Sequence, residues 1–222
     1  MHATSTIRED PMSYHSQHGQ DQFIHERFFQ NHRSGTFIEF GALDGVIDSN
    51  TLFFERELGW NGILIEPNPV AFARLVKNRP NAIKENVALS DCHGRMPFVQ
   101  IIGGFLGWSG IAADIEPQHR ERIQGHLPQE SVHEIEVEVR DLAWLLDRHP
   151  LDQVDFMSID TEGTEAKIMR AFPWERVRVS VFCIENNFDN YAIDDLMNDR
   201  GYAKVARLGT DDIFCLHELA QA

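Results

Sequence analysis

FIEFGALDGVIDSNTLFFERELGWNGILIEPNP, at residues 37–69, contains a complete strand–helix–strand unit. Its first strand is the apolar, β-prone run TFIEF at 36–40, which leads into GALDGVIDSN, a segment rich in residues that permit tight turns. SNTLFFEREL is predicted to be a helix that Asp48 or Ser49 caps and Gly59 ends. GILIE at 62–66 is a continuous apolar run, typical of a strand buried on both faces. These residues predict a βαβ unit in a parallel sheet.

The rest of the chain continues this alternation. Asn68 and Pro69 supply an N-cap and a first-turn proline for a helix that ends before Pro80. Further strands are expected at 82–90, 97–102, 134–139, 154–159 and 177–184, helices at 20–31, 141–150, 164–172 and around 193–197, and a hairpin-like pair in YAKVAR and DIFCLH. EIEVEV at 134–139 alternates apolar and charged residues, as an edge strand does. The pattern predicts a doubly wound, mostly parallel α/β sheet with helices on both faces.

Length and charge limit the domain count and the classes of partner. With 222 residues, we expect a polar tail at 1–19 and one domain over 20–222, with a loop-rich insertion at about 103–133. The 20 basic against 35 acidic residues give a net charge of −15, which repels nucleic acid. No apolar run approaches the roughly 18 residues of a membrane helix, and the N-terminal residues lack the apolar core of a secretory signal. We expect a cytoplasmic protein with no membrane partner.

The three cysteines, Cys92, Cys183 and Cys215, show no CxxC spacing, so neither a disulfide framework nor a thiolate zinc site is indicated. We expect all three to be packing residues.

Two strand ends carry the residues that suit a ligand. In an open parallel sheet, ligands bind beyond the carboxyl ends of the strands. The first strand ends in a turn with two glycines, flanked and interrupted by acidic residues: Glu39, Gly41, Ala42, Asp44 and Gly45. Glu66 ends the second strand, roughly 20 residues later, where a carboxylate can accept hydrogen bonds from both hydroxyls of a ribose. The alternative is a surface turn whose acids are merely solvated, but Glu66 favours an adenosine-type ligand.

Three nucleoside cofactors can be compared. No lysine follows a glycine as a GK[ST] phosphate loop requires, which excludes ATP bound in that way. A nicotinamide dinucleotide usually has GxGxxG, and GALDG has no central glycine. S-adenosylmethionine has no phosphate, and an aspartate in the turn can meet its positively charged amino or sulfonium end. GALDG fits S-adenosylmethionine best.

Four blocks of the sequence resemble the FkbM-like methyltransferases, a branch of the class I S-adenosylmethionine-dependent fold. They are SQHGQDQFI (16–24), the stretch at 37–69, NVALSD (86–91) and VDFMSIDTEGTEAKIM (154–169), and they occur in the family's order. The resemblance implies a Rossmann-like, seven-stranded sheet whose last strand is antiparallel. Leu43 stands where the family's first motif often has Asn. The resemblance implies cofactor contacts at Glu39, Gly41, Ala42, Asp44, Asn50, Glu66, Pro67 and Asn68, with adenine near Asn86, Val87 and Ala88, and Gln20 and Asp21 closing over the cofactor.

The reaction that the resemblance implies is methyl transfer to a hydroxyl of a small-molecule or glycan acceptor, such as a sugar or a natural product. A hydroxyl is a poor nucleophile near neutral pH, so a group must take its proton. Asp160 and Glu162 follow the fourth strand and Glu185 follows the fifth, so we expect these catalytic candidates to face each other, with Asp160 also contacting the cofactor. Asp160, Glu185 and Asn186 would suit Mg²⁺ or another divalent cation. Alternatively, one crowded carboxylate has a raised pKa and acts as the base without a metal. A third possibility is that these acids only cap a helix and accept hydrogen bonds from loop amides.

The insertion carries no motif that identifies the acceptor. GWSG at 107–110 is not the GxSxG of a serine hydrolase, and we expect this loop, with Phe105 and Trp108, to line the acceptor pocket or to pack a small core. His15 and His18 have no obvious third metal ligand. A homodimer is compatible with a small enzyme of this type. The rival functions are a non-catalytic cofactor-binding regulatory module and a nicotinamide-dependent oxidoreductase.

Overall fold

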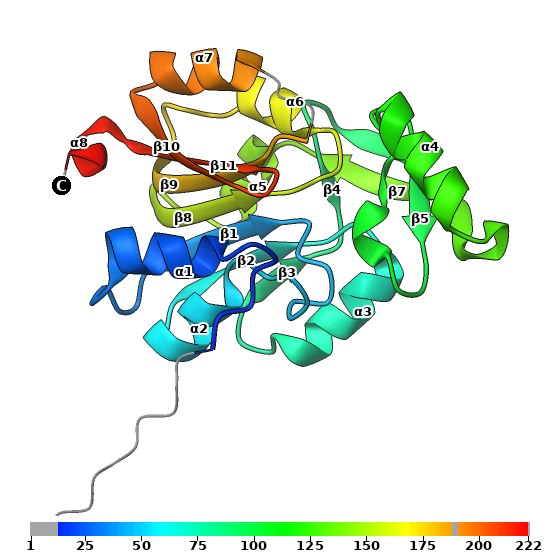
Figure 1. Ribbon diagram of the computed structural model, residues 1–222, viewed down its shortest axis with the longest axis horizontal. Helices are drawn as coiled ribbons and strands as arrows, with labels where there is room; N and C mark the ends of the chain where they lie inside the picture. The colour runs from blue at the N-terminus through cyan, green and yellow to red at the C-terminus, as the bar shows by residue number, and fades with distance from the viewer. Residues whose placement is uncertain (1–12, 188–190, 222) are drawn as a thin grey trace, which may run out of the picture.

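A seven-stranded sheet forms the centre of the computed structural model, which describes residues 13–187 and 191–221 (Figure 1). The strand order is β10-β11-β9-β8-β1-β2-β3. The bounds are β1 Thr36–Phe40, β2 Asn61–Ile65, β3 Ile83–Glu85, β8 Gln153–Ile159, β9 Arg178–Glu185, β10 Tyr202–Leu208 and β11 Asp211–Leu216. Only β11 runs antiparallel to its neighbours, β9 and β10. The expected doubly wound, mostly parallel sheet with an antiparallel last strand is confirmed.

Helices cover both faces of this sheet, which explains why its strands are apolar on both sides. Phe37 of β1 packs in the same cluster as residues of α2 (Leu52–Leu58), α3 (Pro69–Asn78) and the N-terminal helix, with α8 (His217–Ala220) against it. Ile38 and Phe40, on the other face, pack with α5 (Leu142–Arg148), α6 (Glu165–Arg170) and α7 (Tyr191–Asp199). The helix expected at 20–31 is α-helical in α1 (Gln20–Ile24) and continues as a π-helical turn, η1 (His25–Phe29).

Local capping explains where the helices near the cavity begin and end. The Asn68 side chain accepts from the backbone N–H of Val70 at the start of α3, at 3.0 Å. Before α2, the Ser49 hydroxyl accepts from the N–H of Leu52 at 3.1 Å, so Ser49, one of the two expected caps, serves this end. Gly59 ends α2 with a φ of 67°, a left-handed conformation that glycine adopts without strain. The turn chemistry predicted from the sequence is confirmed at these positions.

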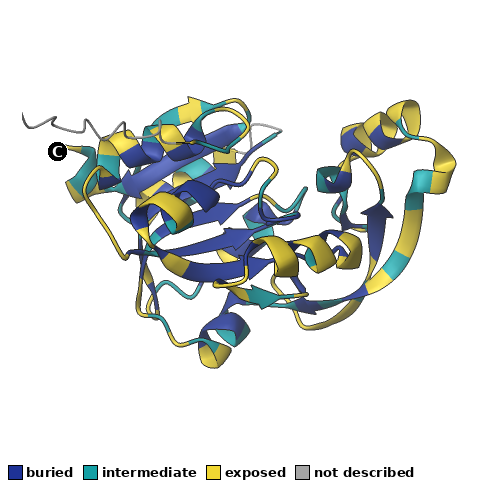
Figure 2. Cartoon of the chain, turned by 90° about the horizontal axis from the view of Figure 1, so that it is seen from below, coloured by how far each residue is buried: buried dark blue, intermediate teal, exposed yellow. Residues whose placement is uncertain are grey.

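The segment at 103–133 contains a short strand and a helix rather than only loops, and the strands predicted on either side of it, at 97–102 and 134–139, are confirmed as parts of a second sheet. The sheet has the order β4-β7-β5-β6, with β4 Ala88–Leu89, β5 Gly94–Ile101, β6 Gly110–Ile111 and β7 Val132–Arg140. Between β6 and β7 lie α4 (Pro117–His126) and the turn η3 (Gln129–Ser131); η2 (Leu106–Trp108) precedes β6. Figure 2 shows this lobe beside the main sheet, with the outer face of α4 exposed.

Two strand predictions need correction here. The single strand expected at 82–90 is divided between β3 in the main sheet and β4 in the second, because the chain crosses from one sheet to the other after Glu85. EIEVEV lies in β7, which pairs with β5 along its length and with β4 at Val139 and Arg140. Residues 134–138 therefore have a strand on one side only, as predicted for an edge, and the prediction is wrong only at Val139, which lies inside the second sheet.

In the described part of the chain, no helix combines the length and apolar character that crossing a membrane requires. Cys183 and Cys215 are buried, as expected of packing residues. Cys92 is exposed, so the packing role predicted for it is wrong.

Candidate functional site

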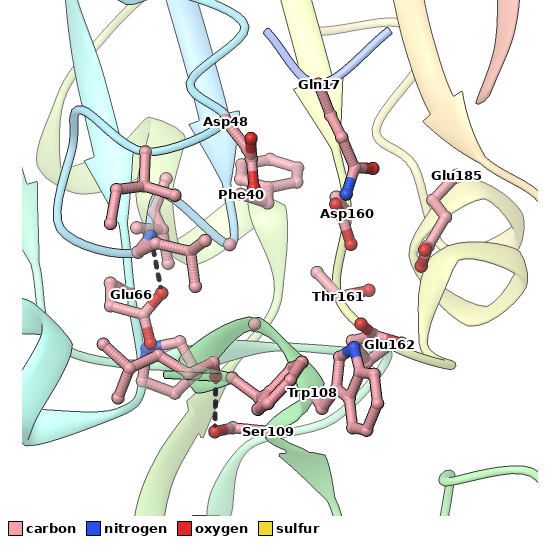
Figure 3. A pocket seen from close by; sticks show the side chains of 18 of the residues that line it. Gln17, Phe40, Asp48, Glu66, Trp108, Ser109, Asp160, Thr161, Glu162 and Glu185 are labelled. Atoms are coloured by element: carbon pink, nitrogen blue, oxygen red, sulfur yellow. Dashed lines mark hydrogen bonds between the residues drawn. The ribbon is translucent and has the colours of Figure 1, made fainter. Parts of the chain in front are cut away.

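A cavity of about 810 Å³ lies at the carboxyl ends of β1, β2, β8 and β9. The main sheet forms one side of it, and the insertion contributes residues 103–109, Ile111 and Arg122. Of the predicted site residues, those that line the cavity are Gln20, Gly41, Asp44, Asn50, Glu66, Pro67, Val87, Ala88, Asp160, Glu162 and Glu185. Figure 3 shows Glu66 on one side of this space and Asp160, Glu162 and Glu185 on the other. The topology thus brings together most of the residues singled out in the sequence.

The glycine turn after β1 lets the chain pass very close to the end of β8. Gly41 has a φ of 76°, and a Cβ atom on it would lie 1.8 Å from the backbone oxygen of Asp160. The N–H groups of Gly41 and Ala42 both donate to the carbonyl of Ile65, at 3.0 and 3.1 Å. Only glycine satisfies this approach, so Gly41 sets the spacing between the turn and the acidic end of β8.

Glu66, at the end of β2, is a carboxyl group with both oxygens already oriented by the backbone. It is 3% exposed, and it accepts from the N–H of Leu43 at 2.9 Å and from that of Asn68 at 2.6 Å. Burial raises its pKa from 4.5 to about 8, against the effect of those two N–H donors. An acid this deeply buried beside a cavity is stabilised as a carboxylate by further donors from a ligand.

Asn50 has an unsatisfied acceptor at the cavity. Its amide nitrogen donates to the Ser158 hydroxyl at 2.9 Å, whereas its oxygen is buried and has no hydrogen-bond partner in the described residues. Asn50 is 7% exposed and lines the cavity. A buried acceptor without a donor costs free energy, so this atom suits a ligand that brings an N–H group.

A buried network holds the loop that carries Asn50. The Glu39 carboxyl accepts from the N–H of Asn50 and from the hydroxyls of Ser49 and Thr51. Arg79, 0% exposed, donates to Glu55 at 2.6 Å and to the carbonyl of Gly45 at 3.1 Å. Burial raises the pKa of Glu39, and the nearby positive charge of Arg79 lowers it. Glu39 therefore acts through the loop rather than in the cavity.

Asp160, Glu162 and Glu185 form a cluster of carboxyl groups, each with an oxygen within 4.8 Å of the others. Asp160 has an exposed side chain that opens into the cavity, whereas Glu185 is buried. Loss of contact with bulk solvent inside the cavity, followed by the negative charges of neighbouring acids, raises the pKa of all three groups. Such a cluster retains protons near neutral pH, and it can exchange one with a bound hydroxyl.

Six predicted residues do not line the cavity. Besides Glu39, the side chain of Asp21 is turned to its own segment, where it accepts from Ser16 and from the N–H of His15. Asn68 connects the Glu66 loop to the insertion by donating to the carbonyl of Ile101 and to Ser109. The remaining three are Ala42, which packs in the core, Asn86, which donates to the Glu66 carbonyl, and Asn186, which donates to Asp212.

Asn186 was expected beside Asp160 and Glu185 as a cation ligand, and the structure places Glu162 there instead. The amide of Asn186 lies 2.8 Å from the carboxylate of Asp212 on β11, which draws it away from the cluster. Neither His15 nor His18 belongs to the acidic cluster, although His18 lines the cavity. Ser109 bonds to backbone groups, accepting from the N–H of Ile101 and donating to the carbonyl of Leu106, as a structural hydroxyl does.

Several residues at the site had no signal in the sequence. Arg79 precedes a proline at a helix end, and nothing local indicates that it is fully buried. His119 lies in a polar helix of the insertion and reaches Glu162, with its Nδ1 atom 3.2 Å from the carboxyl Oε2. Arg122 and Gln17 also line the cavity. Their roles depend on contacts across the chain that spacing alone does not reveal.

Comparisons with known proteins address the identity of this fold and cavity. The chain matches the family described as the methyltransferase FkbM domain over residues 39–204. No curated protein matches it significantly.

Solved structures with a similar architecture include three methyltransferases. A TehB-like S-adenosylmethionine-dependent methyltransferase from Corynebacterium glutamicum has 10% identity, covers 90% of this chain and 89% of its own, and has a TM-score of 0.42. A precorrin-6y C5,15-methyltransferase from Geobacter metallireducens has 11% identity, coverage of 87% and 85%, and a TM-score of 0.42. An O-methyltransferase from Bacillus cereus in complex with S-adenosylhomocysteine has 11% identity, coverage of 92% and 81%, and a TM-score of 0.43.

Proposed function

The chain belongs to the FkbM methyltransferase family, and on that basis we propose that it is an S-adenosylmethionine-dependent O-methyltransferase acting on a hydroxyl of a sugar, a glycan or a natural product. The observation that carries the proposal is that one cavity joins the buried Glu66 to the carboxyl cluster of Asp160, Glu162 and Glu185. Its volume of about 810 Å³ is in the range of sites that enclose a cofactor-sized molecule.

The residues on the Glu66 side fit the cofactor's polar groups. The Glu66 carboxylate would accept hydrogen bonds from the two ribose hydroxyls, which would relieve the cost of its burial. The unpartnered oxygen of Asn50 would accept from the amino group of the methionine part. Val87 and Ala88, which line the cavity beside the end of β2, would flank the adenine ring. Each assignment fills a need that the residues themselves show.

The insertion supplies an aromatic wall for the acceptor. Phe105 and Trp108 line the cavity with their rings 4.7 Å apart, and the guanidinium of Arg122 lies 4.1 Å from the Trp108 ring centre. The apolar faces of a sugar ring stack on aromatic side chains of this kind. The acceptor hydroxyl would then lie between Trp108 and the carboxyl cluster.

The chemistry that S-adenosylmethionine supplies is an electrophilic methyl group on a sulfonium. The chain's own contribution is to orient the acceptor oxygen and to take its proton. As the oxygen–methyl bond forms, the sulfur–methyl bond would break and S-adenosylhomocysteine would leave. An ionised carboxylate of the cluster, Asp160 or Glu185, would accept the hydroxyl proton, which would then pass to solvent from Asp160. The other two acids of the cluster raise the pKa of the base, which makes it a stronger proton acceptor than an isolated carboxylate.

We propose that the cluster holds shared protons rather than a divalent cation, with one of its carboxyl groups left ionised to act as the base. Three carboxyl oxygens within 4.8 Å of one another also suit Mg²⁺, which remains the alternative. The contact of Glu162 with the His119 imidazole supports the proton-sharing form. Methyl transfer should accordingly be unchanged by EDTA, and a loss of activity that Mg²⁺ restores would show that the cation is required.

A thermal melt separates this function from its rivals. A ligand at about 100 times its dissociation constant adds about 2.7 kcal/mol, which raises the midpoint of a domain of this size by roughly 5–10 °C. S-adenosylhomocysteine should produce this shift and NAD should not. A shift with NAD alone would favour a nicotinamide-dependent oxidoreductase. Incubation with methyl-¹³C-labelled S-adenosylmethionine and a glycan panel then tests turnover, because a regulatory module binds the cofactor without forming a labelled methyl ether.

A further inference from the structure

The insertion is anchored on the loop that carries Glu162. Lys167, in the helix after this loop, contacts Asp114 of the insertion at 2.6 Å. A Cβ atom on Gly163 would lie 2.3 Å from the backbone oxygen of Asp114, and one on Gly110 would lie 3.2 Å from that of Glu162. These approaches leave no room between the two segments. The position of Glu162 therefore depends on the insertion as well as on the main sheet.

Glu162 itself has an unusual backbone conformation. Its φ is 57°, in the left-handed region that non-glycine residues seldom occupy. This conformation raises the free energy of the folded chain by roughly 1–3 kcal/mol, and it persists only where the surrounding structure fixes it. Gly163 follows with a φ of 127°, so the loop turns sharply at these two residues. This strain directs the Glu162 side chain toward the insertion and the cavity, which it lines.

His119 is the side chain of α4 that meets Glu162. It is buried, and its Nε2 atom lies 3.1 Å from the backbone carbonyl of Trp108. A carbonyl only accepts, so Nε2 carries the hydrogen in this contact. The other ring nitrogen, Nδ1, lies 3.2 Å from the carboxyl Oε2 of Glu162. One imidazole thus spans the aromatic wall of the cavity and its acidic cluster.

We propose that His119 is a positioning residue that holds the Glu162 carboxyl in the cluster and ties its position to that of the Trp108 loop. The inference rests on the proposed function, in which Glu162 belongs to the proton-accepting cluster and Trp108 to the acceptor wall. Under this arrangement, a displacement of the aromatic wall by the acceptor is transmitted through the imidazole to Glu162, and so to the carboxyl cluster that takes the acceptor's proton. The insertion is then part of the catalytic centre rather than a lid over it.

The electrostatics agree with this geometry. Burial lowers the pKa of His119, and burial with the charges of Asp160 and Glu165 raises that of Glu162. A neutral imidazole beside a protonated carboxyl is the form that both shifts favour. The positive charge of Arg122 acts on both groups, lowering the pKa of each.

Histidine-ring NMR spectra of the full-length protein test the proposal without an acceptor. The His119 signals, assigned by their loss in His119→Asn, should show a protonated Nε2 and an Nδ1 shift that changes in Glu162→Gln. His126→Asn is the matched control, because His126 lies on the same helix near Trp108 and its Nδ1 contacts a backbone carbonyl of α4. It should leave the His119 signals in place. A protonated Nδ1 with a bare Nε2, or an Nδ1 shift insensitive to Glu162→Gln, would overturn the proposal.

Two variants at position 119 provide a reciprocal test. In His119→Asn the side-chain amide can occupy the position of Nδ1 and keep a polar contact with Glu162. In His119→Gln the amide extends to the position of Nε2, so the contact with Glu162 is lost. The ¹³C carboxyl signal of Glu162 should therefore move in His119→Gln and remain closer to the wild-type position in His119→Asn. Equal signals in both variants would refute the positioning role. Calorimetry with S-adenosylhomocysteine on the same samples distinguishes a failure of the positioning role from a failure of the proposed function. If the wild type does not bind S-adenosylhomocysteine, the proposed function is refuted, whatever the spectra show.

Discussion

Replacement of Glu66 by glutamine should change stability and cofactor binding in opposite directions at alkaline pH. In the unfolded chain this carboxyl loses its proton near pH 4.5, whereas in the folded chain burial raises its pKa to about 8. The folded state therefore binds the extra proton between these values, and its stability falls as pH rises through this window. At 1.36 kcal/mol per pKa unit, the loss by pH 8 is at most about 5 kcal/mol.

Glu66→Gln removes this titration and introduces a smaller defect. The wild-type carboxyl accepts from two backbone N–H groups, those of Leu43 and Asn68, whereas a glutamine side chain has one acceptor oxygen. The N–H left unsatisfied costs about 1–3 kcal/mol at any pH. The variant should therefore be less stable than the wild type by about 1–2 kcal/mol at pH 5 and more stable by about 2 kcal/mol at pH 8.5.

Urea unfolding at the two pH values measures the crossover, and calorimetry with S-adenosylhomocysteine at pH 8 measures binding. Loss of the charge-assisted hydrogen bonds to ribose should weaken binding by about 1–3 kcal/mol, which is roughly 5- to 150-fold. Glu57→Gln, which changes an exposed carboxylate on α2, is the matched control and should alter neither quantity. A stability difference that does not vary with pH, or an unchanged affinity, would refute the role given to Glu66.

Three further substitutions test the structure around the cavity. Gly41→Ala places a Cβ 1.8 Å from the Asp160 carbonyl and requires a left-handed φ, so it should lower the free energy of unfolding by about 2–4 kcal/mol; an unchanged urea midpoint would contradict the turn geometry. Arg79→Met leaves Glu55 without its buried partner and should lower the free energy of unfolding by about 3–5 kcal/mol. It should also weaken S-adenosylhomocysteine binding, because the Gly45 loop loses the hydrogen bond that holds it, and normal affinity would show that this network does not support the site. Asp160→Asn should keep cofactor affinity within about two-fold and slow methyl transfer at least about 100-fold, and a fully active variant would remove Asp160 from the mechanism.

The sequence predicts the main sheet well because its signals are local. Apolar runs such as GILIE, the Asn68 cap and the Gly59 stop each depend on a few neighbouring residues, and each occurs where expected. The carboxyl ends of parallel strands lie at one edge, so Glu66 and Asp160 could be placed at a common site from strand order alone.

The sequence predicts the strands on either side of the insertion, but not the elements inside it or the pairing of the second sheet. The α4 segment PQHRERIQGH buries only His119 and Ile123, so it lacks the apolar period that marks a helix. The pairing of β4 with β7 joins residues about 50 positions apart, and no local pattern reports such a contact. Asn186 was assigned to the cluster by its place after β9, but the side chain follows the nearby Asp212 carboxylate instead.

A crystal structure of the protein with S-adenosylhomocysteine is the most direct test of the proposed site. The ribose hydroxyls should lie within hydrogen-bonding distance of the Glu66 carboxylate. The amino group should lie against the side-chain oxygen of Asn50, and the sulfur should be directed toward Asp160 and Glu185. A ribose bound away from Glu66, or a sulfur on the opposite side of the cavity from the carboxyl cluster, would contradict it.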